Sequence, residues 1–114
     1  MPSITPTNVS FETVAREWRC KWDGADPSKA ALQAAQSLIE EHLAAVKAVD
    51  GFVSAQRLVC GGCLDFKINI GVEAEKYGAW ESAGHAPETE FLAALRAIDG
   101  ITEVETQTIT IKTL

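Results

Sequence analysis

Two cysteines separated by two glycines are the first residues of this chain that could carry chemistry. Cys60 and Cys63 lie in "LVCGGCLDFKINI", and the only other cysteine is Cys20. A pair at this spacing occurs in zinc sites, in redox centres and in tight turns flanked by thiols. A structural zinc site needs four ligands, and the other candidates are Cys20 and two histidines without a second paired motif. The sequence therefore predicts no metal site.

The remaining interpretations of this motif differ in what the glycines do. A thioredoxin-type pair begins a helix, whose dipole favours the thiolate, whereas this pair precedes a strand-like pattern. Gly61 and Gly62 suit a two-residue hairpin turn, because glycine adopts positive φ angles without steric cost. Such a turn fixes a register: Cys60 opposite Cys63, Val59 opposite Leu64, and Arg57 opposite Phe66. We expect a plain turn, and the alternative is an oxidant-sensitive disulfide that makes Cys60 and Cys63 redox-sensitive residues.

A second group of residues with chemical potential surrounds His85 in "EKYGAWESAGHAPETEF". Tyr77 and Trp80 precede it within eight positions, so a phenol, an indole and an imidazole can share one wall of a pocket. An aromatic wall with one titratable group suits a site that binds a small apolar or aromatic molecule and exchanges a proton with it. The alternative is a solvated loop histidine.

Polar side chains also interrupt apolar patterns. Arg16 and Arg57 fall on nominally apolar strand faces, where each is expected to extend its charge to solvent or, alternatively, to anchor an anion. Trp18 and Trp22 are expected in the core or in a dimer interface, and a pocket could use either. The sequence contains no Ser-His-Asp order, phosphate loop, dinucleotide fingerprint or HExxH motif.

Composition bounds the class of protein. The chain has 114 residues, 46% of them hydrophobic, and a net charge of −6 with scattered basic residues, which disfavours nucleic-acid binding. No apolar run approaches the roughly 20 residues that span a bilayer. The segment "MPSITPTNVS" lacks the features of a secretory signal. We expect a flexible arm at residues 1–12 and one cytoplasmic domain at residues 13–114, with reduced cysteines, no cofactor, and no nucleic-acid or membrane partner.

The elements that position these residues follow from hydrophobic periodicity. Alternation with a period of two predicts strands at 14–22, 52–60, 64–72 and 101–114. Helical spacing predicts one helix from a cap at Asp26, with Pro27 first, to Val49, and another from Pro87 to Ile98. The order β-α-β-β-α-β predicts an α+β, ferredoxin-like sandwich, an antiparallel sheet with both helices on one face. Because the other face is uncovered, we expect a homodimer that packs sheet to sheet as a dimeric α+β barrel.

From about Val14 to Ile111 the chain resembles the stress-responsive dimeric α/β-barrel proteins, most clearly in "LDFKINIGVEAEKYGAWESAGHAPETEF". In that family a short helix ends in an aromatic residue, and an HPxH-like element and a phenylalanine follow. Trp80, His85 and Phe91 match these positions, whereas Glu88 replaces the second histidine, which is a catalytic base in polyketide-cyclising relatives. Glu88 is then either a carboxylate base or a charge in the first turn of the helix.

The resemblance implies a small-molecule ligand and a cofactor-independent cyclase, lyase or monooxygenase-like activity, with binding alone as the alternative. It implies His85 and Glu88 as catalytic residues. Together with the aromatic group around His85, this gives Tyr77, Trp80, Trp18, Trp22, Asp65 and Phe91 as the expected ligand-binding residues, of which Trp80 and Phe91 match the family pattern.

Two other families of the same fold are similar to parts of the chain. "KWD" and "RLVCGGCLDFKINI" are similar to the nucleotide-exchange domain of elongation factor 1-beta, whose penultimate lysine disturbs the magnesium site of its GTPase. Here Lys112 is third from the end and Thr113 is penultimate. "GCLD" and "ALRAIDGITEVETQTITI" are similar to the effector domain of Lrp/AsnC regulators, which implies an amino-acid site along Gly62–Asp65. A monomeric exchange module and an effector domain without a DNA-binding part are therefore the alternative functions.

Overall fold

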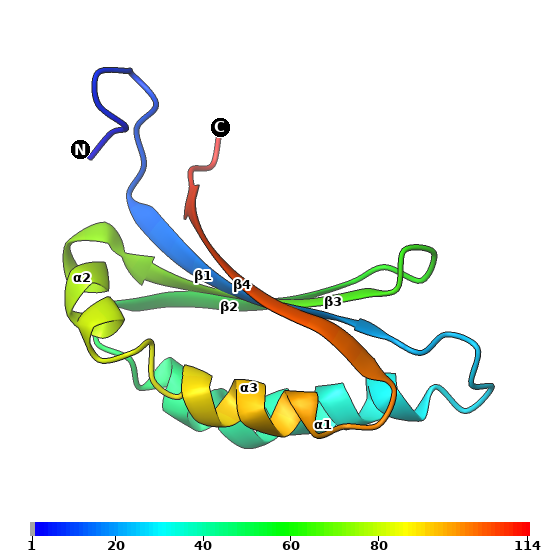
Figure 1. Ribbon diagram of the computed structural model, residues 1–114. Coiled ribbons are helices and arrows are strands. Elements are labelled where there is room, and N and C mark those ends of the chain that lie inside the picture. The colour runs from blue at the N-terminus through cyan, green and yellow to red at the C-terminus, as the bar shows by residue number, and fades with distance from the viewer. Residues whose placement is uncertain (1) are drawn as a thin grey trace.

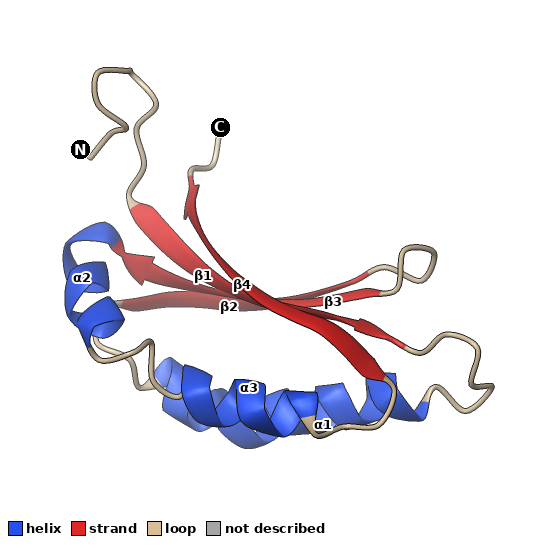
Figure 2. Cartoon of the chain, viewed as in Figure 1, coloured by secondary structure: helices blue, strands red, loops and turns tan. Residues whose placement is uncertain are grey.

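A computed structural model describes residues 2–114 as one four-stranded antiparallel sheet with helices on one face (Figure 1). The elements are β1 (Thr13–Trp22), α1 (Ala30–Lys47), β2 (Phe52–Val59), β3 (Asp65–Glu73), α2 (Ala74–Ser82), α3 (Glu88–Arg96) and β4 (Ile101–Ile111). The strand order is β2-β3-β1-β4. The predicted ferredoxin-like fold is confirmed, with α2 as a short extra helix at one end of the sheet (Figure 2). No helix within residues 2–114 is long and apolar enough to cross a membrane.

The core lies between the sheet and the helices because of the period of two in β1 and β3. Trp18 is paired with Ile68 and Cys20 with Phe66, so these four side chains point to the same face of the sheet. All four are at most 2% exposed. Trp22 points to this face as well and is buried. Of the two expectations for the tryptophans, core and dimer interface, the structure shows the core.

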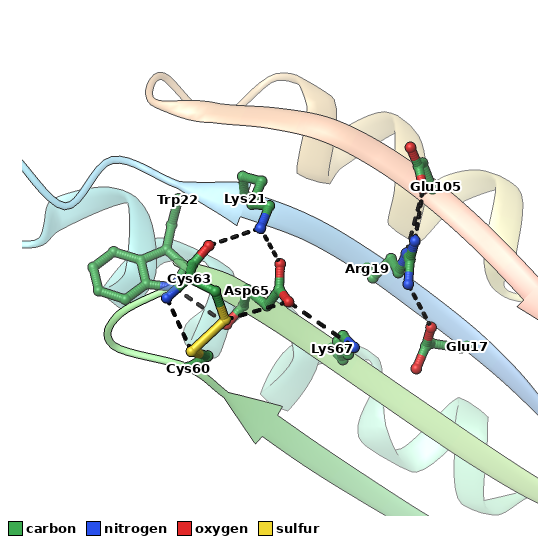
Figure 3. A network of polar contacts seen from close by, with 9 residues as sticks. All are labelled: Glu17, Arg19, Lys21, Trp22, Cys60, Cys63, Asp65, Lys67 and Glu105. Atoms are coloured by element: carbon green, nitrogen blue, oxygen red, sulfur yellow. Dashed lines mark hydrogen bonds and ion pairs between the residues drawn. A yellow bond between two sulfur atoms is a disulfide. The ribbon is translucent and has the colours of Figure 1, made fainter.

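The face of the sheet without helices is polar. Arg19 on β1 pairs with Glu105 on β4 at 3.0 Å, and Lys21 pairs with Asp65 on β3 at 2.6 Å (Figure 3). Our argument for a dimer assumed tryptophan-sized apolar groups on this face. That premise is wrong because Trp18 and Trp22 point toward the helices, and only smaller apolar side chains such as Leu58 and Ile109 remain on the open face.

Helix α1 begins three residues later than predicted, at Ala30 rather than Pro27. The carboxylate of Asp26 accepts hydrogen bonds from the backbone N–H groups of Ser28 at 3.0 Å and Ala30 at 3.3 Å. These bonds, first the one from Ser28, lower the pKa of Asp26. Asp26 therefore closes a turn that precedes the helix, and Lys29, with φ 53°, connects the turn to α1.

The β2–β3 hairpin has a longer loop than the predicted two-residue turn. Val59 is opposite Phe66 and Arg57 opposite Ile68, two residues away from the predicted partners. The positive φ falls on Leu64, at 62°, whose carbonyl accepts the N–H of Trp22 at 3.1 Å. Leu64 is thus held by the end of β1 and does not pair with β2. A shift of two preserves the parity of the strand, so Phe66 and Ile68 still face the core.

Candidate functional site

A polar cluster lies at the end of the sheet where α2 and α3 meet it, with two buried members, two half-buried ones (Arg16 and Glu88) and one exposed one (Thr108). Its members come from four elements and the α2–α3 loop: Arg16 (β1), Tyr77 (α2), His85 (loop), Glu88 (α3) and Thr108 (β4). Tyr77 and His85 are each 7% exposed. Buried polar groups are retained where each has a partner, and here each makes at least one hydrogen bond or ion pair within the cluster.

His85 is directed inward by the backbone of the α2–α3 loop. Its φ of 54° is in the left-handed region, and its N–H donates to the carbonyl of Trp80 at 3.0 Å. The indole N–H of Trp80 donates to the carbonyl of Ala86 at 2.9 Å, which fixes the ring against the loop. The imidazole then meets the Trp80 ring edge to face, with centroids 5.0 Å apart. A strained backbone angle at a buried titratable residue is typical of functional sites.

The imidazole of His85 contacts Tyr77 and faces Glu88. Nε2 lies 2.8 Å from the Tyr77 hydroxyl, and Nδ1 lies 3.7 Å from Oε2 of Glu88. Burial lowers the pKa of His85 below its ordinary value, the charge of Arg16 lowers it further, and Glu88 partly opposes them. The ring is therefore neutral at pH 7. At 3.7 Å the contact between Nδ1 and Glu88 is electrostatic, and the direction of the hydrogen bond between Nε2 and the Tyr77 hydroxyl follows the tautomer of the ring: with the proton on Nδ1, Nε2 accepts.

Glu88 is a fixed anion. Its carboxylate accepts hydrogen bonds from Nε of Arg16 at 2.7 Å, from Nη2 of Arg16 at 3.3 Å and from the indole N–H of Trp18 at 2.7 Å. Burial alone would raise the pKa of Glu88, but the hydrogen bonds from Arg16 and Trp18 outweigh it and hold the pKa below the ordinary value. The same pair raises the pKa of Arg16. Glu88 is therefore ionised and fully engaged at neutral pH.

One chain of hydrogen bonds connects the ion pair to the imidazole. Nη1 of Arg16 donates to the hydroxyl of Thr108 at 3.0 Å, and that oxygen lies 2.9 Å from the Tyr77 hydroxyl. Either hydroxyl of the Thr108–Tyr77 pair can be the donor, because a hydroxyl oxygen that accepts from Arg16 can still accept or donate a second hydrogen bond. Burial raises the pKa of Tyr77, so the phenol keeps its proton. The cluster is therefore a continuous chain of hydrogen bonds from Arg16 to a neutral imidazole.

A cleft of about 350 Å³ lies beside this cluster, between α1 and α2. Trp80 and Ala86 form one side, and small apolar residues of α1 form the other. An ion pair between Lys76 and Asp50, 3.4 Å apart, borders the opening. Trp80 lines the cleft and also contacts the imidazole of His85, with ring centroids 5.0 Å apart. The volume is at the small end of ligand sites and suits a molecule of one or two rings.

The structure brings together most of the residues that the sequence singles out. Tyr77, Trp80, His85 and Glu88 form the site. Trp18 contributes its indole N–H, and Phe91 stacks on Trp18 with centroids 4.6 Å apart, as part of the core below.

Two expected ligand-binding residues, Trp22 and Asp65, lie elsewhere. The indole of Trp22 donates to the carbonyl of Asp65 at 3.3 Å, beside the β2–β3 loop (Figure 3). That loop is at the opposite end of the sheet from α2 (Figure 1). Within residues 2–114 no group of three or more His, Cys, Asp or Glu side chains is placed to hold a metal ion.

Sequence reasoning missed Arg16, for which it favoured a solvent-exposed end. That expectation is wrong, because the guanidinium is held by Glu88, Thr106 and Thr108 at 2.7 to 3.3 Å. The sequence did hold one indication: Arg16 is the only charged residue among the even-numbered residues of β1, and the others are apolar. Nothing in the sequence distinguishes Thr106 and Thr108 from the other threonines of β4, so their contacts with Arg16 could not be predicted.

Known proteins resemble this chain in structure and not in sequence. No family model matches the chain, and no curated protein sequence does. Among solved structures, SnoaB, a cofactor-independent oxygenase from Streptomyces nogalater, is 21% identical with a TM-score of 0.61, over 90% of this chain and 96% of that chain. The ActVA-Orf6 monooxygenase of Streptomyces coelicolor, in complex with nanaomycin D, is 19% identical with a TM-score of 0.62, over 91% and 90%.

A third neighbour, the heme-degrader MhuD from Mycobacterium tuberculosis with two hemes in its active site, is 17% identical with a TM-score of 0.57, over 86% of this chain and 94% of that chain. The TM-scores of 0.57 to 0.62 show a common fold. The structural neighbours of this chain are therefore dimeric α+β barrel proteins of the antibiotic-biosynthesis-monooxygenase type, and the chain has their ferredoxin-like architecture.

Proposed function

We propose that this protein is a cytoplasmic homodimer that binds a small aromatic molecule with an acidic hydroxyl and removes the proton of that hydroxyl. The observation that carries the proposal is the buried pair of Tyr77 and His85, 2.8 Å apart, with a neutral imidazole. A neutral base that is shielded from water and linked to one hydroxyl group is suited to receiving a proton from a bound ligand.

In the proposed step the ligand hydroxyl takes the place of Thr108 beside Tyr77. The ligand donates its proton to the Tyr77 oxygen while Tyr77 donates its own proton to Nε2 of His85. The ligand becomes an anion, Tyr77 ends unchanged, and His85 becomes an imidazolium. Trp80 supplies an aromatic surface for the ring system of the ligand.

Glu88 supports this step as a positioning residue. Its Oε2 lies 3.7 Å from Nδ1 of His85, so its negative charge stabilises the imidazolium when it forms. Its other contacts keep it ionised and leave it no role as the base. This assigns different functions to the two residues that the sequence suggests as catalytic.

The neighbours support the proposal by what their names state. One is a cofactor-independent oxygenase, and another is a monooxygenase in complex with nanaomycin D. A deprotonated aromatic hydroxyl is rich in electrons and is the form in which such a molecule gives electrons to O2. A proton-accepting pair is therefore the part of the protein that an oxygenation without a cofactor requires first.

Binding of 7-hydroxycoumarin, a two-ring aromatic alcohol, tests the proposal. We expect His85→Gln to weaken binding at least about tenfold, because a hydrogen bond to a buried base contributes about 1.5 kcal/mol. His42→Gln is the matched control, since His42 also lies on the helix side but bonds to the carbonyl of Leu38 at 2.9 Å. Equal affinity of the two variants would contradict the proposal. If binding depends on His85 but no oxygen is consumed with any aromatic alcohol, the protein is a binding protein only.

The homodimer is a separate part of the proposal. The open face of the sheet carries paired charges and the half-buried Ile109 near the end of β4, and no helix of residues 2–114 covers it (Figure 1). Sedimentation equilibrium is expected to give twice the mass of one chain, and Ile109→Lys is expected to reduce it to one. A strict monomer would contradict the dimer and would favour the exchange-module alternative.

A further inference from the structure

The β2–β3 loop contains a second chemically active feature, which the proposed function does not use. Cys60 and Cys63 are joined by a disulfide, with Cα atoms 5.5 Å apart (Figure 3). The disulfide was the alternative to the plain turn that we expected, and it also differs from the expectation of reduced cysteines. The bridge lies in an exposed loop, and a Cβ atom built on Gly61 or Gly62 would meet nothing within 4 Å. The exposed side of the bridge is at Cys63.

The two sulfur atoms have different surroundings. Sγ of Cys60 accepts the backbone N–H of Cys63 at 3.0 Å. Sγ of Cys63 lies 3.5 Å from Oδ2 of Asp65, and that carboxylate is an anion whose pKa is lowered chiefly by its hydrogen bond from Lys21. A donor stabilises a thiolate on Cys60, whereas a carboxylate destabilises one on Cys63. Cys63 is exposed and Cys60 is half-buried.

From this asymmetry we propose that the loop is a thiol–disulfide exchange site for low-molecular-weight thiols such as glutathione, in which Cys63 is attacked and Cys60 leaves. A glutathione thiolate attacks Sγ of Cys63, the S–S bond breaks, and its electron pair leaves on Cys60, which takes a proton from water. A second glutathione thiolate attacks the glutathione sulfur of the mixed disulfide and releases Cys63. The protein gains two electrons and two protons, and two glutathiones become one glutathione disulfide.

Two hydrogen bonds hold the β2–β3 loop independently of the disulfide. The N–H of Cys60 donates to the carbonyl of Asp65 at 3.0 Å, and Nζ of Lys21 donates to the carbonyl of Cys63 at 2.7 Å. Neither bond needs the disulfide. A bridge between residues only three apart also removes little entropy from the unfolded chain compared with bridges over long loops. Opening it therefore changes the loop and leaves the sheet intact, as a reversible redox site requires.

Alkylation of single cysteines tests the asymmetry. In a Cys20→Ser background, Cys63→Ser leaves Cys60 alone and Cys60→Ser leaves Cys63 alone. We expect iodoacetamide at pH 7 to modify Cys60 about threefold faster or more, because the thiolate is the reactive form. Adding Asp65→Asn should accelerate Cys63, whereas Asp50→Asn, at the opposite end of β2 and exposed, should not. Equal rates, or a faster Cys63 with Asp65 intact, would overturn the assignment.

Mass spectrometry of the natural chain tests the exchange itself. Without reductant, the unfolded protein should show one free thiol, Cys20, and three free thiols would overturn the proposal. Brief treatment with glutathione followed by acid should trap the mixed disulfide on Cys63. Trapping on Cys60, or no reduction at millimolar glutathione, would contradict it. Neither result depends on ligand binding at His85, so this proposal and the proposed function can fail separately.

Discussion

Replacing Glu88 with glutamine tests the ion pair that organises the candidate site. The carboxylate accepts three hydrogen bonds, two from Arg16 and one from Trp18, at 2.7 to 3.3 Å. In Glu88→Gln the amide keeps one acceptor but places N–H groups against the guanidinium. A hydrogen bond to a charged group contributes about 1.5 to 3 kcal/mol, and breaking a fully buried pair costs about 3 to 5 kcal/mol.

The side chains of Arg16 and Glu88 are 18% and 13% exposed, so solvent recovers part of this loss. We therefore expect the free energy of unfolding to fall by about 2 to 3 kcal/mol, which lowers Tm by about 8 to 12 °C in a domain of this size. Urea denaturation at pH 7 measures the free energy, and thermal unfolding measures Tm.

Glu90→Gln is the matched control for this change. Glu90 also lies in the first turn of α3 but is exposed, so its replacement removes the same favourable charge near the helix N-terminus and costs about 0.5 kcal/mol or less. A double-mutant cycle with Arg16→Met should give a coupling of about 1 to 3 kcal/mol between positions 16 and 88. If Glu88→Gln is no more destabilising than Glu90→Gln, the description of Glu88 as a fixed, half-buried anion is refuted.

The remaining predictions concern acid stability, two glycines and one hydroxyl. Folding lowers the pKa of His85, so the unfolded chain binds the proton more readily, and the free energy of unfolding should decline as the pH falls below about 6.5. A urea midpoint that is constant from pH 7 to 5.5 would exclude this, and so would the same dependence of the midpoint on pH in His85→Gln. Gly51→Ala should lower the free energy of unfolding by more than about 1 kcal/mol in denaturant titrations, because φ is +85° and the new Cβ would lie 2.5 Å from Cβ of Lys76. Gly78→Ala in α2 has open space and should raise it by about 0.5 to 1 kcal/mol. Equal effects of the two substitutions would contradict the geometry. Tyr77→Phe should weaken 7-hydroxycoumarin binding about as much as His85→Gln, and unchanged affinity in calorimetry would remove Tyr77 from the proposed proton transfer.

The fold was accessible from the sequence because it follows from local patterns. Alternating apolar residues in β1 and β3, and helical spacing in α1 and α3, decide which face of each element is buried, and the order of elements then limits the topology. The details that failed depend on competition between alternatives of similar energy. Asp26 could cap either a helix or a turn, and the hairpin could close with two or more loop residues without changing which face Phe66 occupies.

The site was only partly accessible, because half of it is distant in sequence. Tyr77, Trp80 and His85 lie within nine residues, so their proximity could be expected from α2 and the following loop. Arg16 meets Glu88 across 72 positions and Thr108 across 92, and only the register of β1 with β4 brings them together. Trp22 was expected as an aromatic residue that a pocket could use and Asp65 as a polar partner, but their places on β1 and β3 put them at the other end of the sheet.

The absorbance spectrum of bound 7-hydroxycoumarin tests the central claim most directly, because the phenol and phenolate forms of this probe absorb at different wavelengths. We predict that the bound probe converts to the phenolate at a lower pH in the natural protein than in His85→Gln, because only the natural protein offers the departing proton a base. Equal midpoints of the phenolate absorbance in the two proteins, or a lower midpoint without His85, would contradict the assignment of Tyr77 and His85 as the proton-accepting pair.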